Sequence, residues 1–286
     1  MKFKSKHISI TIFILFAAVP VLLGFGYALL YSFGLTGILS EGFTTEYWEK
    51  TLLATEFWKS LGFSLFIAAV VMTTSLFFSL WIVISWTKNL YKGLLSYVTY
   101  LPLAFPAIVM AFFSFQLLSK SGFISRVIFN LGWIDDLSQF PDWTNDAYGV
   151  AIIFSLCLLI TPFFIILYSN LYQNERIPEL KALAQTLGAK KNQITTRIIV
   201  PILLKKSAFT IMLFLIFVMG TYEIPLLLGR QDPSMLSVFI IQKLQKFNLA
   251  DIPQAYAVSV IYILLIATLI AVVYKTRPAF FNPEKN

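Results

Sequence analysis

Long apolar segments alternate with short polar ones along this 286-residue chain. A bilayer core about 30 Å thick is crossed by a helix of roughly 20 mainly apolar residues. Six segments meet this requirement, at residues 8–32, 60–86, 98–118, 149–170, 207–229 and 255–274. The first follows three lysines but is too long for the apolar part of a typical signal peptide, so we read it as an uncleaved span. The pattern predicts an all-α, polytopic membrane protein with a single transmembrane domain over residues 1–286.

Basic residues are distributed unevenly between the two sets of loops. The N-terminus, the loops at 87–97 and 171–206 and the tail from Lys275 hold 15 of the 22 Lys and Arg, with three acidic residues. The other three loops hold the remaining seven, with ten acidic residues. Cytoplasmic loops of membrane proteins carry the excess of Lys and Arg. We therefore expect both termini and the 171–206 loop on the cytoplasmic side of the inner membrane.

Composition agrees with lipid as the main solvent and excludes several kinds of chemistry. Hydrophobic residues make up 58% of the chain and charged residues only 13%, about half the charged fraction of a soluble domain. The net charge of +8 resides in short loops, so no nucleic-acid partner is expected. The chain has one His, His7, and one Cys, Cys157, and no P-loop motif. We expect no catalytic residues, no metal site and no cofactor bound by this chain.

The 171–206 loop contains a short amphipathic helix pattern. Leu180, Leu183, Ala184 and Leu187 are spaced i, i+3, i+4 and i+7, which places them on one helical face. Pro178 and Glu179 suit a helix start, and Gly188 can adopt the left-handed conformation that ends it. A second stretch follows with Ile194, Ile198 and Ile202 at intervals of four, and Pro201 is expected to end or kink it. By pattern alone, the apolar face either lies in the lipid interface or docks onto a protein.

This loop resembles the signature of binding-protein-dependent ABC importer permeases. That motif reads Glu-Ala-Ala, three residues, Gly, nine residues, Ile, one residue and Leu-Pro. The chain has Ala184, Gly188, Ile198 and Pro201 in this register, with Ala182 at the Glu position and Val200 at the Leu position. Residues 121–132 resemble the corresponding loop of polyamine-importer permeases, and residues 255–259 also resemble the ABC importer permease family. The resemblance extends from the second span to the C-terminus.

The resemblance implies the type I ABC importer permease fold and a set of partners. The implied partners are two cytoplasmic ATPase subunits that bind ATP and Mg²⁺, a second permease that is identical or different, and an external solute-binding protein. It also implies that the loop docks onto an ATPase and couples ATP hydrolysis to transport. The residues implied in coupling are Leu180, Ala182, Leu183, Ala184, Leu187, Gly188, Ile198 and Pro201. Because Ala182 replaces a carboxylate, we expect docking to rely more on apolar contact.

Glu223 is the one ionisable residue well inside a predicted span. Charges within a bilayer usually face a bundle interior or a wet cavity. Pro225 is expected to break the helix and free backbone carbonyls for a cation or polar group. Tyr222, Glu223 and Pro225 are therefore candidate substrate-pathway residues, although Glu223 could equally be a protonated link between helices.

The expected function is import of a small polar solute, with polyamine as the first candidate because of the resemblance and the acidic outer loops. Ferric iron, thiamine and small anions remain alternatives. An ion-coupled secondary transporter acting alone would be expected to show several intramembrane charges or a repeated half. A scaffold subunit without transport is the third class, and loss of uptake on deletion would exclude it.

Overall fold

The computed structural model describes the chain except residues 1–10, 39, 41, 87–93, 247 and 277–286. No strand occurs among the described residues. Six helices in this part of the chain are long and apolar enough to cross a membrane, which confirms the predicted number. They are Thr11–Ser32, Thr55–Trp86, Ala107–Asn130, Val150–Asn174, Lys191–Gly220 and Asp251–Val273.

The chain divides into two compact units. Unit 1 comprises residues 1–59 and 238–272, and unit 2 comprises residues 60–237 and 273–286. The elements that lie mainly in unit 1 are the π-helical turn η1 (Ile14–Ala18), α2 (Val19–Ser32), α3 (Glu46–Leu53), α13 (Leu236–Gln245) and α14 (Asp251–Thr276). Those of unit 2 are α4 (Thr55–Trp86), α5 (Leu94–Tyr100), η2 (Leu101–Ala104), α6 (Ala107–Leu118), α7 (Phe123–Asn130), η3 (Leu137–Gln139), α8 (Val150–Asn174), α9 (Ile177–Thr186), α10 (Lys191–Ile194), the π-helical turn η4 (Thr195–Ile199), α11 (Val200–Gly220) and α12 (Glu223–Leu228).

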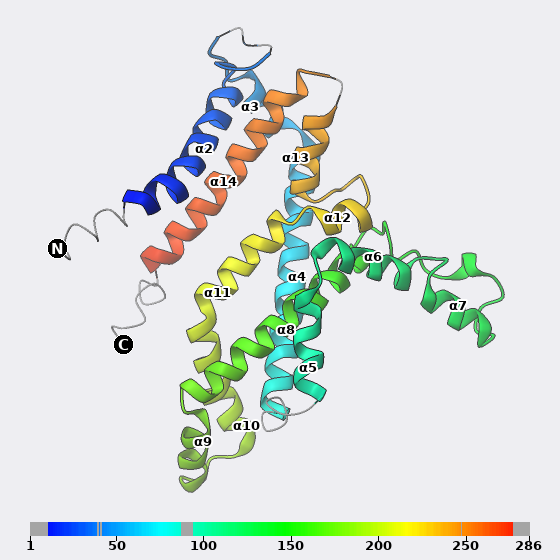
Figure 1. The fold of residues 1–286 in the computed structure, drawn as a ribbon, viewed down its shortest axis with the longest axis vertical. Coiled ribbons are helices and arrows are strands. Elements are labelled where there is room, and N and C mark those ends of the chain that lie inside the picture. The colour runs from blue at the N-terminus through cyan, green and yellow to red at the C-terminus, as the bar shows by residue number, and fades with distance from the viewer. Residues whose placement is uncertain (1–10, 39, 41, 87–93, 247, 277–286) are drawn as a thin grey trace. The chain divides into compact units, whose positions relative to one another are not determined.

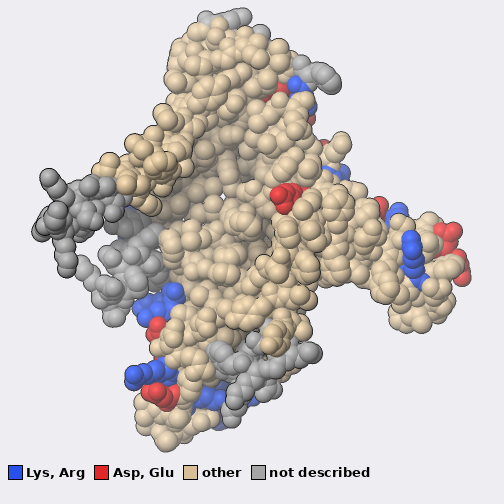
Figure 2. All heavy atoms as spheres, in the orientation of Figure 1, with Lys and Arg blue, Asp and Glu red and all other residues tan. Residues whose placement is uncertain are grey.

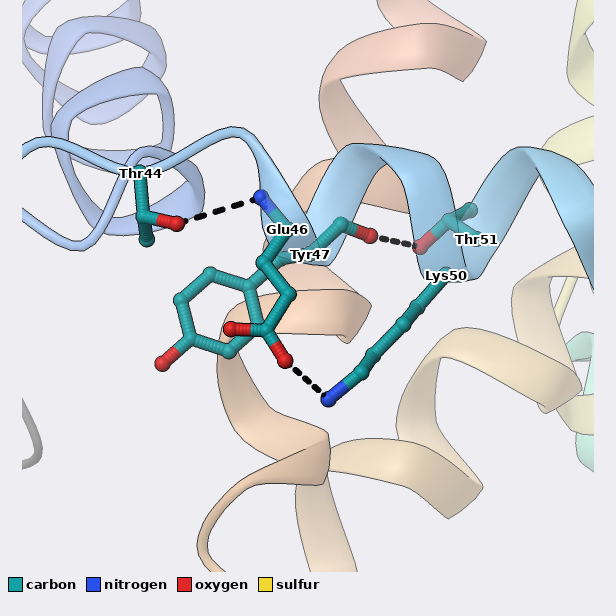
Figure 3. Close-up of polar contacts among 5 residues, drawn as sticks. All are labelled: Thr44, Glu46, Tyr47, Lys50 and Thr51. Atoms are coloured by element: carbon teal, nitrogen blue, oxygen red, sulfur yellow. Dashed lines mark hydrogen bonds and ion pairs between the residues drawn. The ribbon is translucent and has the colours of Figure 1, made fainter.

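Within unit 1, aromatic side chains join α2 to α14 and to the start of α3. The rings of Tyr31 and Tyr256 stack with centroids 4.4 Å apart, and the Trp48 indole Nε1 donates to Ser32 Oγ over 3.2 Å. At the start of α3, shown in Figure 3, the Glu46 N–H donates to Thr44 Oγ1 over 3.2 Å. The hydrogen bond and charge of Glu46 raise the pKa of the exposed Lys50 ammonium. The Trp48–Ser32 bond holds α3 against α2, and α2 in turn packs on α14 through the stacked tyrosine rings.

Helix α4 buries small polar side chains together with apolar ones. Ser64, Ser75 and Ser79 are fully buried along one side, whereas Phe77 and Trp81 are 64% and 53% exposed. Membrane helices pack through small residues, since lipid is as apolar as a leucine side chain. In Figure 2 the charged groups of unit 2 gather around α9 and α10 and around α7, and much of the intervening surface has none.

Prolines shape several of these helices. The third predicted span is interrupted, because Phe105 is extended (ψ 132°) between η2 and α6 and Pro106 is the N-cap residue of α6. Pro20 and Pro201 are each preceded by a π-helical turn, η1 and η4. A proline ring clashes with the carbonyl four residues earlier, and the wider turn relieves that clash. The helix therefore continues through Pro201, so of the two expected outcomes, an end or a kink, the end does not occur.

Candidate functional site

α9 and the helix that starts at α10 form a hairpin at one end of unit 2 (Figure 1). The linkers are short, because α8 ends at Asn174 and α9 begins at Ile177. Arg176 connects the two helices in the left-handed conformation, with φ 49°. α10, η4 and α11 then follow without a break from Lys191 to Gly220. The predicted short helix, glycine break and second helix are all present, but the second helix is the beginning of the fifth span rather than a separate element.

A Schellman-type cap ends α9 at Gly188. Gly188 has φ +81°, the left-handed conformation expected from the sequence. Its N–H donates to the carbonyl of Gln185 over 3.0 Å, and the Ala189 N–H donates to the carbonyl of Ala184, also over 3.0 Å. This pair of bonds satisfies carbonyls that the helix end would leave without a partner. The turn direction at Gly188 therefore sets how the chain enters α10.

The predicted apolar stripe on α9 is divided between a buried and an exposed part. Ala184 is buried. Leu180, Leu183 and Leu187 are 37%, 59% and 80% exposed. Ala182, where the motif has Glu, is also exposed. Within the described part of the chain, three leucines in a row along one helix thus lack a covering surface, which is unusual for a polar loop.

The buried positions after Gly188 differ from the predicted ones. The sequence places Ile194, Ile198 and Ile202 on one face, but the structure buries Ile194, Ile199 and Leu203 and leaves Ile198 and Ile202 half-buried. The reason is η4, because a π-helical turn adds one residue and shifts the following face by one position. Pro201 was the signal from which this shift could have been predicted. Ile199 and Leu203 are the core residues that the period of four missed.

The fifth span is interrupted at its other end, before Pro225. α11 ends at Gly220, Thr221 is extended (ψ 139°), and α12 begins at Glu223. Pro225 lies in the first turn of α12, where helix N–H groups have no intrahelical acceptor, so its missing N–H costs little. The predicted break is therefore present, but it lies at Thr221 and Tyr222, three to four residues before Pro225, because a proline ring clashes with the carbonyl four positions earlier. Glu223 also lies beyond the end of the spanning helix rather than inside it.

Side chains around this interruption are held by a few specific bonds. Ser237 Oγ donates to the carbonyl of Thr221, so this carbonyl already has a donor. The Asn145 N–H donates to the carbonyl of Leu228 over 2.9 Å, which ties the end of α12 to the loop between α7 and α8. Sequence reasoning identified neither Ser237 nor Asn145, because both contacts join segments distant along the chain.

α12 has a buried and an exposed face. Ile224, Pro225 and Leu228 are buried. Glu223 is exposed, and Tyr222 is half-buried. The three candidate pathway residues are therefore close in the sequence, but Pro225 is buried, whereas Tyr222 is half-buried and Glu223 is exposed. They lie at the opposite end of α11 from the hairpin, about 31 Å away at 1.5 Å per residue over its 21 residues.

No group of three or more His, Cys, Asp and Glu residues in the described part of the chain has a metal-binding arrangement. The hairpin presents the exposed leucines of α9, and the interruption presents the carboxylate of Glu223 and the phenol of Tyr222.

Comparison with known proteins gives one family and a set of similar folds. The family model described as "binding-protein-dependent transport system inner membrane component" matches residues 82–276. Two solved structures have TM-scores of 0.69 at 17% and 16% identity. The first is a bacterial ABC transporter involved in import of the acidic polysaccharide alginate, with 96% of this chain and 93% of that chain covered. The second is a bacterial alginate ABC transporter in complex with an alginate pentasaccharide-bound periplasmic protein, with 97% and 94% covered. No curated protein sequence matches this chain.

Proposed function

Because the chain belongs to the family of binding-protein-dependent transport system inner membrane components, we propose that α9 is the helix through which an ATPase subunit drives this permease. The fold is that of a type I ABC importer permease, and the chain is a multi-pass inner-membrane subunit of such an importer. Membership of this family argues against an ion-coupled transporter that works alone. ATP and Mg²⁺ would bind to the ATPase and not to this chain.

The exposed leucines of α9 are the observation that carries this proposal. Leu183 and Leu187 are 59% and 80% exposed on a helix whose end is closed by a glycine cap. Burying two such side chains is favourable by about 1.5–3 kcal/mol each, so an apolar cleft on a partner would bind them well. Lys190, Lys191 and Arg197 lie beside this helix in the sequence. They favour a cytoplasmic position for the hairpin by the positive-inside rule.

For the solute, we propose a small polar cation, with polyamine as the first candidate. Glu223 is exposed at the end of α11 beside Tyr222, and a carboxylate next to an aromatic ring is suited to attract an amine. The acidic residues of the loops at 33–59, 119–148 and 230–254 would favour cations on the outer side. Ferric iron, thiamine and small anions are the alternative solutes. The alginate importers share the fold at low identity, which carries no argument for alginate here.

The assembly that this function requires has three further components. They are a pair of ATPase subunits, a second permease that is identical or different, and an external solute-binding protein. ATP binding would close the ATPases, displace α9 and open the pathway outward to receive solute. Hydrolysis would then restore the inward-facing state.

Replacement of Leu187 tests the docking assignment. Leu187→Asp puts a charge into the proposed apolar contact, and we expect co-purification of the ATPase subunit to fall at least tenfold. Leu131→Asp is the matched control, since Leu131 is 59% exposed at the end of α7, away from the hairpin. Normal co-purification of the ATPase with Leu187→Asp would exclude α9 as the docking helix.

A further inference from the structure

Two contacts join α8 to α11 where these helices leave the hairpin. Lys206 Nζ lies 3.1 Å from Glu175 Oε1, which connects α11 to the C-cap residue of α8. The hydroxyl oxygens of Tyr168 and Ser207 lie 3.3 Å apart, within hydrogen-bond distance. Glu175 follows the last residue of α8, and Tyr168 lies about two turns earlier on the same helix. Each pair therefore bridges the two helices that carry α9 and α10.

The burial of these four residues indicates how far water competes with the two contacts. Tyr168 and Ser207 are 0% and 1% exposed, so water does not compete for their hydroxyl groups. The side chains of Glu175 and Lys206 are 28% and 41% exposed, which makes theirs a partly screened ion pair. Such a pair contributes little to global stability. Its effect is on geometry, because it fixes the spacing of α8 and α11 at the open end of the hairpin.

Both helices lead to the interruption that carries Glu223. α11 reaches it directly, since Gly220 is followed by Thr221, Tyr222 and Glu223. α8 reaches it by packing, because α8 contacts α12. A Cβ on Gly229, at the end of α12, would lie only 3.2 Å from Ile152 Cδ1 on α8. Figure 1 shows α8 and α11 extending from the hairpin end of unit 2, and these two helices pack against each other.

We propose that the Glu175–Lys206 pair and the Tyr168–Ser207 contact form a clamp that makes α8 and α11 move as one body when α9 is displaced. This inference rests on the proposed docking of an ATPase at α9. Without the clamp, a force on α9 could separate the two helices at the hairpin end and would be lost before it reached α12. With the clamp, both helices carry the displacement to Tyr222 and Glu223. The four residues are positioning residues, and none is placed on the solute route.

A fluorophore on α12 reports this transmission without any knowledge of the solute. Leu226 is 51% exposed, so Leu226→Cys in a Cys157→Ala background gives a single labelling site. The labelled permease, assembled with its ATPase and second permease in nanodiscs, receives ATP and vanadate. Glu175→Lys and Lys206→Glu should each reduce the fluorescence change at least fivefold while the ATPase stays bound. The double exchange restores opposite charges and should return the signal to within about twofold of the original.

Two further variants separate the clamp from a general effect of charge or stability. Lys205→Glu makes the same charge change at an exposed neighbour that has no ion pair among the described residues, and it should leave the signal unchanged. Tyr168→Phe removes one hydroxyl without altering ring packing, and it should reduce the signal about threefold. This variant provides the test if the single charge variants fail to assemble. An unchanged signal in all assembled clamp variants, or no rescue by the double exchange, would overturn the proposal. If ATPase binding proves insensitive to Leu187→Asp, the docking assignment fails instead.

Discussion

The backbone N–H of Ala189 donates to the carbonyl of Ala184 across the end of α9, over 3.0 Å. This bond exists because Gly188 between them has φ +81°, a conformation that costs an L-residue with a side chain about 1–2 kcal/mol. Apart from its chain neighbours, no heavy atom of the described residues lies within 4 Å of a Cβ built at Gly188, so a substitution there acts through backbone strain and not through a clash.

Gly188→Val should therefore uncouple ATP hydrolysis from transport or release the ATPase while leaving membrane insertion intact. Gly188→Asn should be much milder, because Asn tolerates the left-handed conformation. Gly132→Val is the matched control, since Gly132 has φ +71° and open space around its Cβ but lies after α7. Co-purification and ATPase activity of the assembled complex measure the effect. Equal losses from Gly132→Val and Gly188→Val would refute a specific role of this turn.

The predicted orientation can be checked by thiol labelling. Cysteine at Asn192 should resist a membrane-impermeant reagent in intact cells, whereas cysteine at Asp142 should react. Both side chains are exposed, so accessibility reports the side of the membrane rather than burial. Cys157→Ala removes the native thiol, which lies in α8. The opposite labelling pattern would reverse the topology and place α9 outside the cell.

Replacement of Glu223 separates attraction of a cation from a structural role. If the carboxylate attracts the solute, Glu223→Gln removes charge at constant size and should weaken apparent affinity for spermidine at least about fivefold, equivalent to about 1 kcal/mol. Uptake of labelled spermidine, with the amount of assembled complex measured alongside, gives the result. Glu56→Gln is the control, because Glu56 is also exposed and lies in the first turn of α4, outside the proposed solute route.

Two outcomes would count against this part of the proposal. Normal uptake by Glu223→Gln at normal complex levels would remove Glu223 from the pathway. Absence of spermidine uptake by the unmodified importer would exclude polyamine and leave the alternative solutes.

Asp136 gives a pH dependence in the loop between α7 and α8. Its Oδ1 accepts the Ser138 N–H over 2.6 Å, and this backbone hydrogen bond lowers the pKa of the carboxyl group. The local stabilisation is therefore complete above the ordinary aspartate pKa of about 3.9 and is lost as pH falls through the lower native value. Hydrogen exchange of the peptide containing Ser138 should lose protection over that range. Asp136→Asn should abolish the pH dependence, while Asp135→Asn should preserve it.

Some features of the fold and site follow from short-range chemistry and were predictable. The six spans follow from the length of apolar chain that a bilayer requires. The turn at Gly188 follows because apolar residues spaced three and four positions apart predict a helix that ends before this glycine. Without a Cβ, the glycine can adopt the left-handed conformation of the turn. Leu180, Leu183 and Leu187 could be placed on one face of α9 for the same reason, but their exposure could not, because it depends on what packs against that face.

The sequence predicts that the helices are distorted near Pro201 and Pro225, but not at which residues the distortions lie. Pro201 signalled a distortion, yet the resulting π-helical turn moved the buried face from Ile198 to Ile199. Pro225 was expected to break a helix, whereas the interruption lies at Thr221 and Tyr222. In both cases the backbone has more than one way to accommodate a proline, so the sequence alone does not give the position of the distortion.

The amino-acid sequence by itself determined that this chain lies in a membrane, how many helices cross it and where a capped hairpin interrupts them. Those properties depend on residues close together in the chain and on their transfer from water to lipid. Only the tertiary structure decided that Glu175 meets Lys206, that Tyr168 meets Ser207 and that α8 and α11 both lead to α12. The two side-chain contacts join residues 31 and 39 positions apart. The free energy of all these contacts arises only when the helices pack, so no local pattern encodes them.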